Sequence, residues 1–316
     1  MKAYPFDKYK SSKLRVIIDS DCACEGDDAF AIAHALITSK FEIKAICAAS
    51  FLHEEDSVKR SYDAILRLLS EMDMEGAAPV LMGALPFKSE NEYELSEASK
   101  FIIEEAMRDD DKPLFVVVQG AITNLAAALK EKPEIAKRMQ CIWIGGSDYP
   151  NGGNEFNLSN DVYAARAVME SEVPLWQVPR NVYSMMRVSF MTLYEKLSVC
   201  GKAGNYLLTQ LFEVNKKQQE KYHEGENPEF TKDTPYELYA AYGSGEMWVL
   251  GDSPVVGLML SSQRFDRDII GAPYINDDST YTLRPDNERK IAVYKSIDSH
   301  FIFEDFFSKM KYQFAE

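Results

Sequence analysis

Short apolar runs alternate with longer amphipathic segments along most of the chain. Residues 14–18, apolar except for Arg15 and rich in β-branched side chains, predict a buried strand, and residues 29–36, apolar with no helix breaker, predict a helix. Further strands are expected at residues 43–49, 79–82, 114–118, 141–144, 175–178 and 291–294. Helices are expected at residues 57–69, 98–107, 125–129, 161–170, 255–260 and 302–310, and a charged helical region at about 193–242 includes a polar stretch, 222–234, expected to be a surface loop or lid.

Strands that alternate with helices at this spacing predict a mostly parallel central sheet flanked by helices on both faces. No internal repeat or low-complexity linker interrupts the pattern, and 316 residues fit one large α/β domain. We therefore expect a single Rossmann-like α/β domain over residues 1–316.

Composition narrows the choice of partners and compartment. The formal net charge of −15 argues against nucleic acid, because phosphate binding needs a basic surface. Residues 1–13 lack the apolar core of a secretory leader, and no apolar run approaches the length of a membrane span. Five cysteines without disulfide-framework spacing fit a reducing compartment, so we expect a cytoplasmic protein that does not contact membranes.

Acidic residues gather between the first predicted strand and the first predicted helix. They are Asp19, Asp21, Glu25, Asp27 and Asp28. In an open α/β sheet the ligand crevice lies at this carboxyl end of the strands. Asp19 and Asp21, two apart on an extended strand end, are expected to point to one side. Converging carboxylates repel one another unless a cation lies among them, and oxygen ligands suit Ca²⁺ or Mg²⁺. The alternative is a polar loop that leads into a capped helix.

Three further stretches have both a structural and a functional interpretation. Residues 120–124 follow a buried strand, and on spacing alone they form an ordinary turn in which Thr123 or Asn124 caps a helix. Glu155 and Asn157 can hydrogen-bond sugar hydroxyls, although a surface turn is the simpler interpretation. Asp252, two residues before a proline, is a typical helix cap.

Taken in order, these motifs resemble the inosine–uridine preferring nucleoside hydrolases. A strand, Asp-x-Asp, a loop, Asp-Asp and an apolar helix resemble that family's metal-binding fingerprint. The loop at residues 22–26 is longer than the common form and resembles a longer-loop bacterial branch. Residues 120–124 resemble the family's Gly-Pro-Leu-Thr-Asn turn, with Ala121 in place of proline. Residues 155–157 resemble its Glu-Phe-Asn ribose-binding motif, and Asp252 its last acidic position.

The resemblance implies a role for each of these residues. Asp21, Asp28, Asp252 and the main-chain carbonyl of Thr123 would hold Ca²⁺. Asp21 would also accept a proton from the attacking water, and Asp19 would support the metal ligands from behind. Asp27, Glu155 and Asn157 would hold the ribose.

The chain departs from the family at two further positions. Many members have a histidine that protonates the leaving base, and here that position is Gly251. An asparagine usually lies six residues before the glutamate, and Tyr149 occupies that place, so Asn151 or Asn154 is the candidate replacement.

Two further residues are candidate substrate contacts. His53 follows the second strand and is a candidate contact at the crevice edge, whereas His34 is expected to be a packing residue. Trp248 either stacks on a nucleobase or packs in the core.

The predicted function is Ca²⁺-dependent hydrolysis of the N-glycosidic bond of ribonucleosides to ribose and free base. The expected partner is a small nucleoside substrate, and relatives suggest a homodimer or homotetramer. One alternative is a metal-dependent ribose- or nucleoside-binding protein without catalysis. The other is a phosphohydrolase of the haloacid dehalogenase type, which also begins with strand and Asp-x-Asp but is poorly matched by adjacent Asp27 and Asp28.

Overall fold

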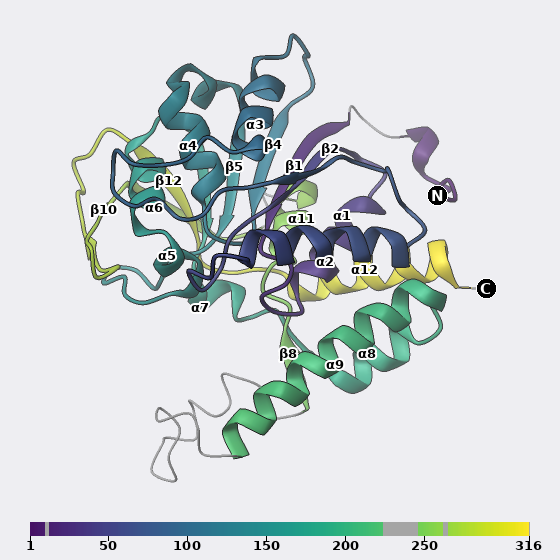
Figure 1. Cartoon of the computed structure of the whole chain (residues 1–316). Helices are drawn as coiled ribbons and strands as arrows, with labels where there is room; N and C mark the ends of the chain where they lie inside the picture. Colours follow the sequence, from purple (N-terminus) through teal and green to yellow (C-terminus); the bar gives the residue numbers. More distant parts are fainter. Residues whose placement is uncertain (10–12, 224–245, 262–264, 316) are drawn as a thin grey trace.

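A sheet of eight strands forms the centre of the molecule (Figure 1). The computed structural model describes residues 1–9, 13–223, 246–261 and 265–315. The strand order is β3-β2-β1-β4-β5-β6-β12-β9, and every neighbouring pair is parallel except β12 and β9. The strands are β1 Leu14–Ser20, β2 Phe41–Ala48, β3 Val80–Met82, β4 Leu114–Val118, β5 Gln140–Ile144, β6 Leu175–Val178, β9 Arg267–Gly271 and β12 Lys290–Tyr294. The predicted α/β fold with a mostly parallel sheet is therefore confirmed.

Helices cover both faces of this sheet (Figure 1). One face packs against α1 Asp28–Leu36, α2 Ser57–Glu71, α11 Pro254–Ser261 and α12 Ser299–Phe314. The other packs against α3 Glu97–Met107, α4 Thr123–Glu131, the 3-10 helix η2 Pro133–Arg138 and α6 Val162–Glu170. Alternate residues of β1 enter the two cores, since Val16 and Ile18 belong to the first and Ile17 to the second. An apolar run buried on both sides is what parallel strands require.

Smaller elements surround the sheet. They are η1 Asp7–Tyr9, α5 Phe156–Asn160, α7 Arg180–Tyr183, α8 Phe190–Leu197 and α9 Gly201–His223, with the two-stranded pairs β7 Arg187–Ser189 and β8 Met247–Val249, and β10 Tyr274–Ile275 and β11 Tyr281–Thr282. The helices α8 and α9 lie side by side and project from the sheet in Figure 1. The helical region expected from residue 193 is confirmed as far as residue 223. Its remainder, with most of the expected lid, lies outside the described residues.

The chain reverses its direction across the sheet between β1 and β4. The strands β2 and β3 lie on one side of β1, whereas β4, β5 and β6 follow on the other. Such a switch point leaves a crevice at the carboxyl ends of the two central strands. Asp19 and Val118 are paired at that edge, so the segments that follow β1 and β4 meet there.

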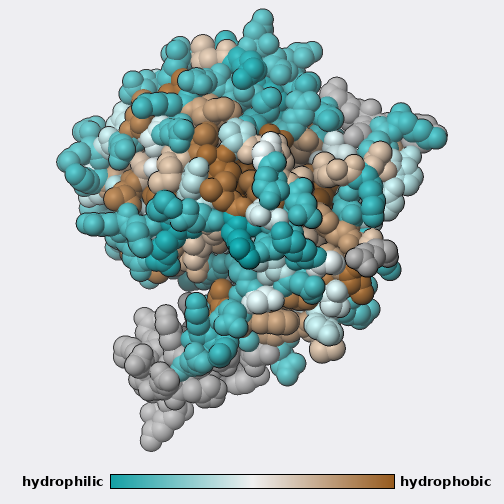
Figure 2. All heavy atoms as spheres, turned by 45° about the vertical axis from the view of Figure 1, so that its right-hand side comes forward, coloured by the Kyte–Doolittle hydropathy of each residue, from teal (hydrophilic) through white to brown (hydrophobic). Residues whose placement is uncertain are grey.

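Polar residues cover most of the face shown in Figure 2, and hydrophobic residues gather toward its middle. Within the described ranges, every helix is too short or too polar to cross a bilayer.

Candidate active site

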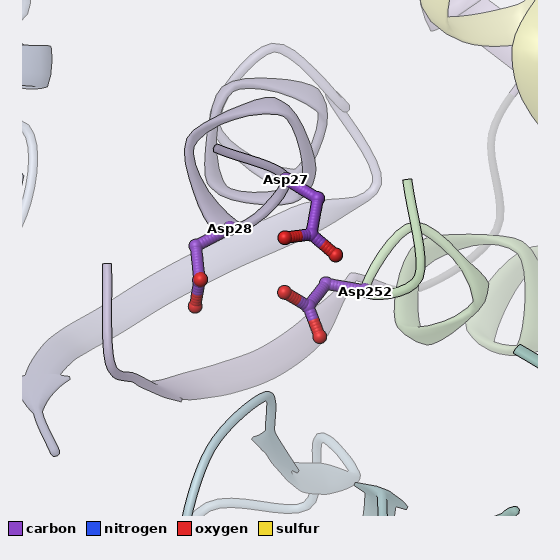
Figure 3. Close-up of side chains that lie close together, drawn as sticks. All are labelled: Asp27, Asp28 and Asp252. Atoms are coloured by element: carbon purple, nitrogen blue, oxygen red, sulfur yellow. The ribbon is translucent and has the colours of Figure 1, made fainter. Parts of the chain in front are cut away.

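Three carboxylates converge at the switch point (Figure 3). Asp27 and Asp28 come from the start of α1, and Asp252 comes from the turn before α11. One oxygen from each lies within 4.8 Å of the others, and all three side chains are buried. We call these three residues the acid triad. Buried carboxylates this close together repel one another, and an oxygen-only donor set suits a hard divalent cation.

Hydrogen bonds fix the starts of the two helices relative to each other. The hydroxyl of Ser20, the last residue of β1, donates to Asp28 Oδ1 over 2.6 Å. Backbone N–H groups of Gly251 and Asp252 bond to the carboxylate of Asp27. Asp27 is the N-cap of α1 but makes no capping bond of its own, so its carboxylate turns toward Asp252 instead.

The pKa values of the triad are raised because three carboxyl groups lie close together and are buried. Burial raises the pKa of Asp27 to about 6, although backbone hydrogen bonds lower it in part. The pKa values of Asp28 and Asp252 rise well above the ordinary range, first through burial and then through repulsion by Asp27. A bound cation offsets the cost of ionising these buried carboxyl groups, since it attracts the negative charges that otherwise repel one another. Carboxylates bind a metal ion in their deprotonated form. The donor set therefore fits a divalent cation.

A pocket lies beside the triad. Its other lining residues are Asp21, Cys24, Glu25, Gln119, Ile144, Glu155, Phe156, Asn157, Tyr183 and Gly251. Asp21 reaches it because Gly120 has no side chain, since a Cβ there would lie 2.5 Å from Asp21 Oδ1. Asp27 rather than Asp21 completes the tightest group of acids. The roles of Asp21 as metal ligand and base stay predictions.

Asp19 lies behind the pocket. It is fully buried, and its Oδ1 accepts a hydrogen bond from Asn124 Nδ2 over 2.9 Å. Burial raises its pKa to about 7. Only Asp21 of the two lines the pocket, and the expectation that Asp19 and Asp21 point to the same side stays a prediction. This position agrees with a supporting role for Asp19.

Glu155 and Asn157 line the same pocket as the triad. Glu155 caps α5, and its carboxylate accepts hydrogen bonds from the backbone N–H groups of Gly146, Asn157 and Leu158 and from the Tyr183 hydroxyl, at 2.6 to 3.2 Å. Burial nevertheless raises its pKa. Asn157 Nδ2 donates to the carbonyls of Gln119 and Ile144, each over 2.9 Å. The structure thus brings both residues into the pocket that the acids line, and their role in holding ribose stays a prediction.

Besides Asp19, four predicted site residues do not line this pocket. The Thr123 hydroxyl donates to Asp161 over 2.7 Å, and the role of its carbonyl stays a prediction. Asn154 is exposed and accepts a hydrogen bond from Ser159, and His53 is exposed. Trp248 packs in the core, 5 % exposed, with its ring 6.5 Å from that of Phe190.

The pairing of β7 with β8 places Trp248 opposite Val188 in that core, so the stacking interpretation of this residue is not supported. His34 is buried and contacts Asp305 over 2.8 Å, as expected of a packing residue.

Gln119 and Tyr183 are among the lining residues that sequence reasoning missed. Gln119 directly follows β4, so the strand-end argument used for the acids also applies to it. Tyr183 ends α7, which follows β6, and no local pattern marks it. Its ring packs against Gly251, since a Cβ on Gly251 would lie 3.1 Å from Tyr183 Cδ2.

The chain is thus an α/β protein with a mostly parallel sheet and, at its switch point, an acid triad that could hold a metal ion. The chain belongs to the inosine-uridine preferring nucleoside hydrolase family, whose model matches residues 16–268. The family that the ordered motifs resembled is thereby confirmed.

Individual relatives are more distant. The chain is 28 % identical over 184 residues to the pyrimidine-specific ribonucleoside hydrolase RihA of Salmonella schwarzengrund, a match that covers 51 % of this chain and 58 % of the relative. The chain thus matches little more than half the length of that curated relative.

Among solved structures, it is similar to the purine-preferring ribonucleoside hydrolase of Gardnerella vaginalis, with a TM-score of 0.70 at 18 % identity over 95 % of this chain and 98 % of the other. It is also similar to the inosine-uridine preferring nucleoside hydrolase of Bacillus anthracis, with a TM-score of 0.60 at 15 % identity over 94 % and 99 %. At these identities the likenesses show the fold.

Proposed function

We propose that this protein hydrolyses the N-glycosidic bond of ribonucleosides and releases ribose and a free base. The observation that carries the proposal is one pocket lined by the acid triad together with Glu155 and Asn157, in a chain of the nucleoside hydrolase family. Carboxylates that line a pocket suit a reaction whose transition state carries positive charge on the sugar ring.

The residues that would hold the cation are Asp21, Asp28, Asp252 and the Thr123 carbonyl, and the position of Asp27 adds it to this set. We propose Ca²⁺, because several carboxylates and a carbonyl form a flexible set of hard oxygen ligands. When bound, this ion would contact sugar hydroxyls and lower the pKa of a water molecule.

The chain's own residues supply the remaining chemistry. Asp21 takes a proton from the attacking water as general base, the water oxygen bonds to the anomeric carbon, and the C–N bond breaks. The bonding electron pair leaves with the base, which takes up a proton from solvent water. Glu155 and Asn157 hold the ribose, and the hydrogen bonds from Gly146, Leu158 and Tyr183 keep the Glu155 carboxylate in one orientation. Negative side chains around the ring stabilise its developing positive charge.

The proposal also covers the cellular compartment, the partner and the oligomeric state. Cys22, Cys24, Cys47, Cys141 and Cys200 are all free thiols, which supports a reducing, cytoplasmic setting. A small nucleoside is the proposed partner, and the net charge of −15 speaks against nucleic acid. We propose a homodimer or homotetramer, as the family resemblance suggests.

Reducing-sugar release from a panel of purine and pyrimidine ribonucleosides tests the proposal. Release that EDTA abolishes and Ca²⁺ restores is the expected result, and the panel also identifies the preferred base. A protein that binds Ca²⁺ and ribose yet releases no sugar from any nucleoside overturns the proposal in favour of a binding protein. Release of phosphate from phosphate esters would instead favour a phosphohydrolase.

A further inference from the structure

Gln119 is a buried amide that has no partner. It lies between the end of β4 and Gly120, and its side chain is only 2 % exposed. Neither its Nε2 nor its Oε1 makes a hydrogen bond to any described residue, yet it lines the pocket beside the acid triad. A buried carboxamide without partners costs stability, because it has given up water and gained nothing in exchange. Such a group calls for a ligand that supplies the missing bonds.

The other side-chain N–H and O–H donors of the pocket are already committed. The Asn157 amide donates to two backbone carbonyls, and the Tyr183 hydroxyl donates to Glu155. The acids offer oxygens, which accept hydrogen bonds when ionised. Among the described lining residues, Gln119 therefore carries the uncommitted side-chain N–H donor of the pocket.

A sugar hydroxyl needs both kinds of partner. Its O–H donates to a carboxylate, but its lone pairs require a donor or a cation. A pocket walled by acids satisfies the first need and leaves the second open. The carboxamide of Gln119 offers N–H donors and an acceptor oxygen from one planar group, so it complements a hydroxyl or a ring oxygen that has left water.

We propose that Gln119 is a substrate-positioning residue that donates from Nε2 to a sugar oxygen and accepts from a sugar hydroxyl at Oε1. This inference rests on the proposed function and deepens it. In the ligand-free protein the unpaired amide lowers stability, and in the complex it fixes the sugar relative to Asp21 and the acid triad. Stability and binding should thus respond to Gln119 in opposite directions.

A pair of glutamine variants separates this role from a structural one. Gln119→Leu removes the polar atoms at nearly constant volume. Gln177→Leu is the matched control, because Gln177 is equally buried but its amide donates to the Gly145 carbonyl over 3.0 Å and accepts from Tyr149 over 2.7 Å. Gln177 does not line the pocket. Gln119→Glu, which replaces the donor nitrogen by an acceptor, keeps the test open should the leucine variant not fold.

The measurements are ligand-free melting temperature, the shift in melting temperature on adding free ribose to Ca²⁺-loaded protein, KM and kcat for the best nucleoside, and Ca²⁺ affinity. For Gln119→Leu we expect a melting temperature that is equal to that of wild type or higher by up to about 2 °C. We also expect a smaller ribose shift, a KM higher by about three- to tenfold, and unchanged Ca²⁺ affinity. Gln119→Glu should lose the ribose shift as well. Gln177→Leu should melt lower and keep the wild-type ribose shift.

Other outcomes overturn the inference in distinguishable ways. If wild type hydrolyses nucleosides and Gln119→Leu matches it in KM and ribose shift, Gln119 does not position the sugar, and the proposed function stands. A Gln119→Leu protein that melts lower but binds ribose normally shows a structural residue. Weaker Ca²⁺ binding in that variant would make Gln119 a cation ligand instead. Wild-type protein that neither releases sugar nor responds to ribose overturns the proposed function and this inference together.

Discussion

Asn124 donates a hydrogen bond to Asp19 over 2.9 Å and so links the first turn of α4 to the end of β1. The carbonyl oxygen of the same amide accepts from the Ala84 backbone N–H over 3.1 Å and from the Ser96 hydroxyl over 2.9 Å. One side chain thus connects four segments behind the pocket. Because both Asn124 and Asp19 are fully buried, water cannot replace any bond that is lost.

Asn124→Asp should destabilise the fold strongly. The substitution replaces the nitrogen that donates to Asp19 with an oxygen, so two buried carboxyl groups face each other. We expect the free energy of unfolding at neutral pH to fall by about 2–4 kcal/mol, measured by urea titration. Asn91→Asp, the same change at an exposed position, is the control and should leave stability nearly unchanged. Equal stability of the two variants would show that the Asn124 bond contributes little.

Asp21→Asn should remove turnover while the fold remains intact. If Asp21 is the general base, kcat should fall by roughly 10²–10⁴, because an amide cannot take up the water proton. The same change should raise the melting temperature of the metal-free protein, since burial and repulsion by Asp28 disfavour the Asp21 carboxylate. Asp109→Asn, at an exposed position just after α3, controls for loss of a surface charge. Substantial activity in Asp21→Asn would exclude this base.

Metal removal should affect activity and stability together. At neutral pH, EDTA is expected to abolish sugar release and lower the melting temperature, and Ca²⁺ should restore both, because the acid triad is then neutralised. Asp252→Asn should weaken Ca²⁺ binding by at least about tenfold in calorimetric titration. Asp111→Asn, at an exposed site, should bind Ca²⁺ as wild type does. Unchanged affinity in Asp252→Asn would place the cation elsewhere.

Stability of the metal-free protein should fall as pH rises from 6.5 to 8. The pKa of Asp19 is raised to about 7, and those of Asp28 and Asp252 are raised well above their usual 3.8. The folded state therefore holds protons that the unfolded state has released, and the stability that depends on them disappears as pH passes the folded pKa values. His34, whose pKa is lowered from 6.5, exchanges its proton below this window.

Melting curves in EDTA at several pH values measure this effect. Excess Ca²⁺ should reverse the trend, because the cation binds the deprotonated carboxylates more tightly at high pH. Asp252→Asn, which removes one of the raised groups, should show a shallower slope in EDTA. A slope of the opposite sign in wild type would mean that the acids are ionised without a cation.

The central strands could be predicted because their signal is local. The bounds of β4 and β6 agree with the strands predicted at residues 114–118 and 175–178, since a strand buried on both faces is mostly apolar, with Gln177 as the one polar residue of β6. The antiparallel edge strand β9 was missed. Its Arg-Asp start and exposed residues give no apolar run, and its pairing with β12 is a tertiary contact.

The site residues also differ in whether a local sequence signal marks them. Asp27, Asp28 and Glu155 could be found because they directly follow predicted strands or match an ordered motif, and the topology then brings those strand ends together. Tyr183 could not, because it reaches the pocket only through the path of α7. Trp248 shows the converse, since its place near Asp252 in sequence did not bring it into the pocket.

Gly251 lies where a histidine would be expected from the family motif, and the surrounding structure is built around a glycine. A Cβ there would lie 3.1 Å from Tyr183 Cδ2 and 3.3 Å from Asp27 Oδ2, and the Tyr183 hydroxyl bonds to Glu155 over 2.9 Å. Gly251→Ala requires shifts of a few tenths of an ångström and should be tolerated. Gly251→His must displace the Tyr183 ring and so release Glu155, which we expect to raise KM and lower the melting temperature.

Adding Tyr183→Ala to Gly251→His tests this explanation directly, because the second substitution makes room for the imidazole. The two changes should be non-additive in melting temperature and KM. Expressed as a free energy, the loss in the double variant should be smaller than the sum of the losses in the single variants by at least about 1 kcal/mol. Tyr183→Phe, which removes the hydroxyl and keeps the ring, separates loss of the Glu155 bond from loss of volume. Strict additivity would show that the Tyr183 ring does not restrict position 251, and the glycine would then need another explanation.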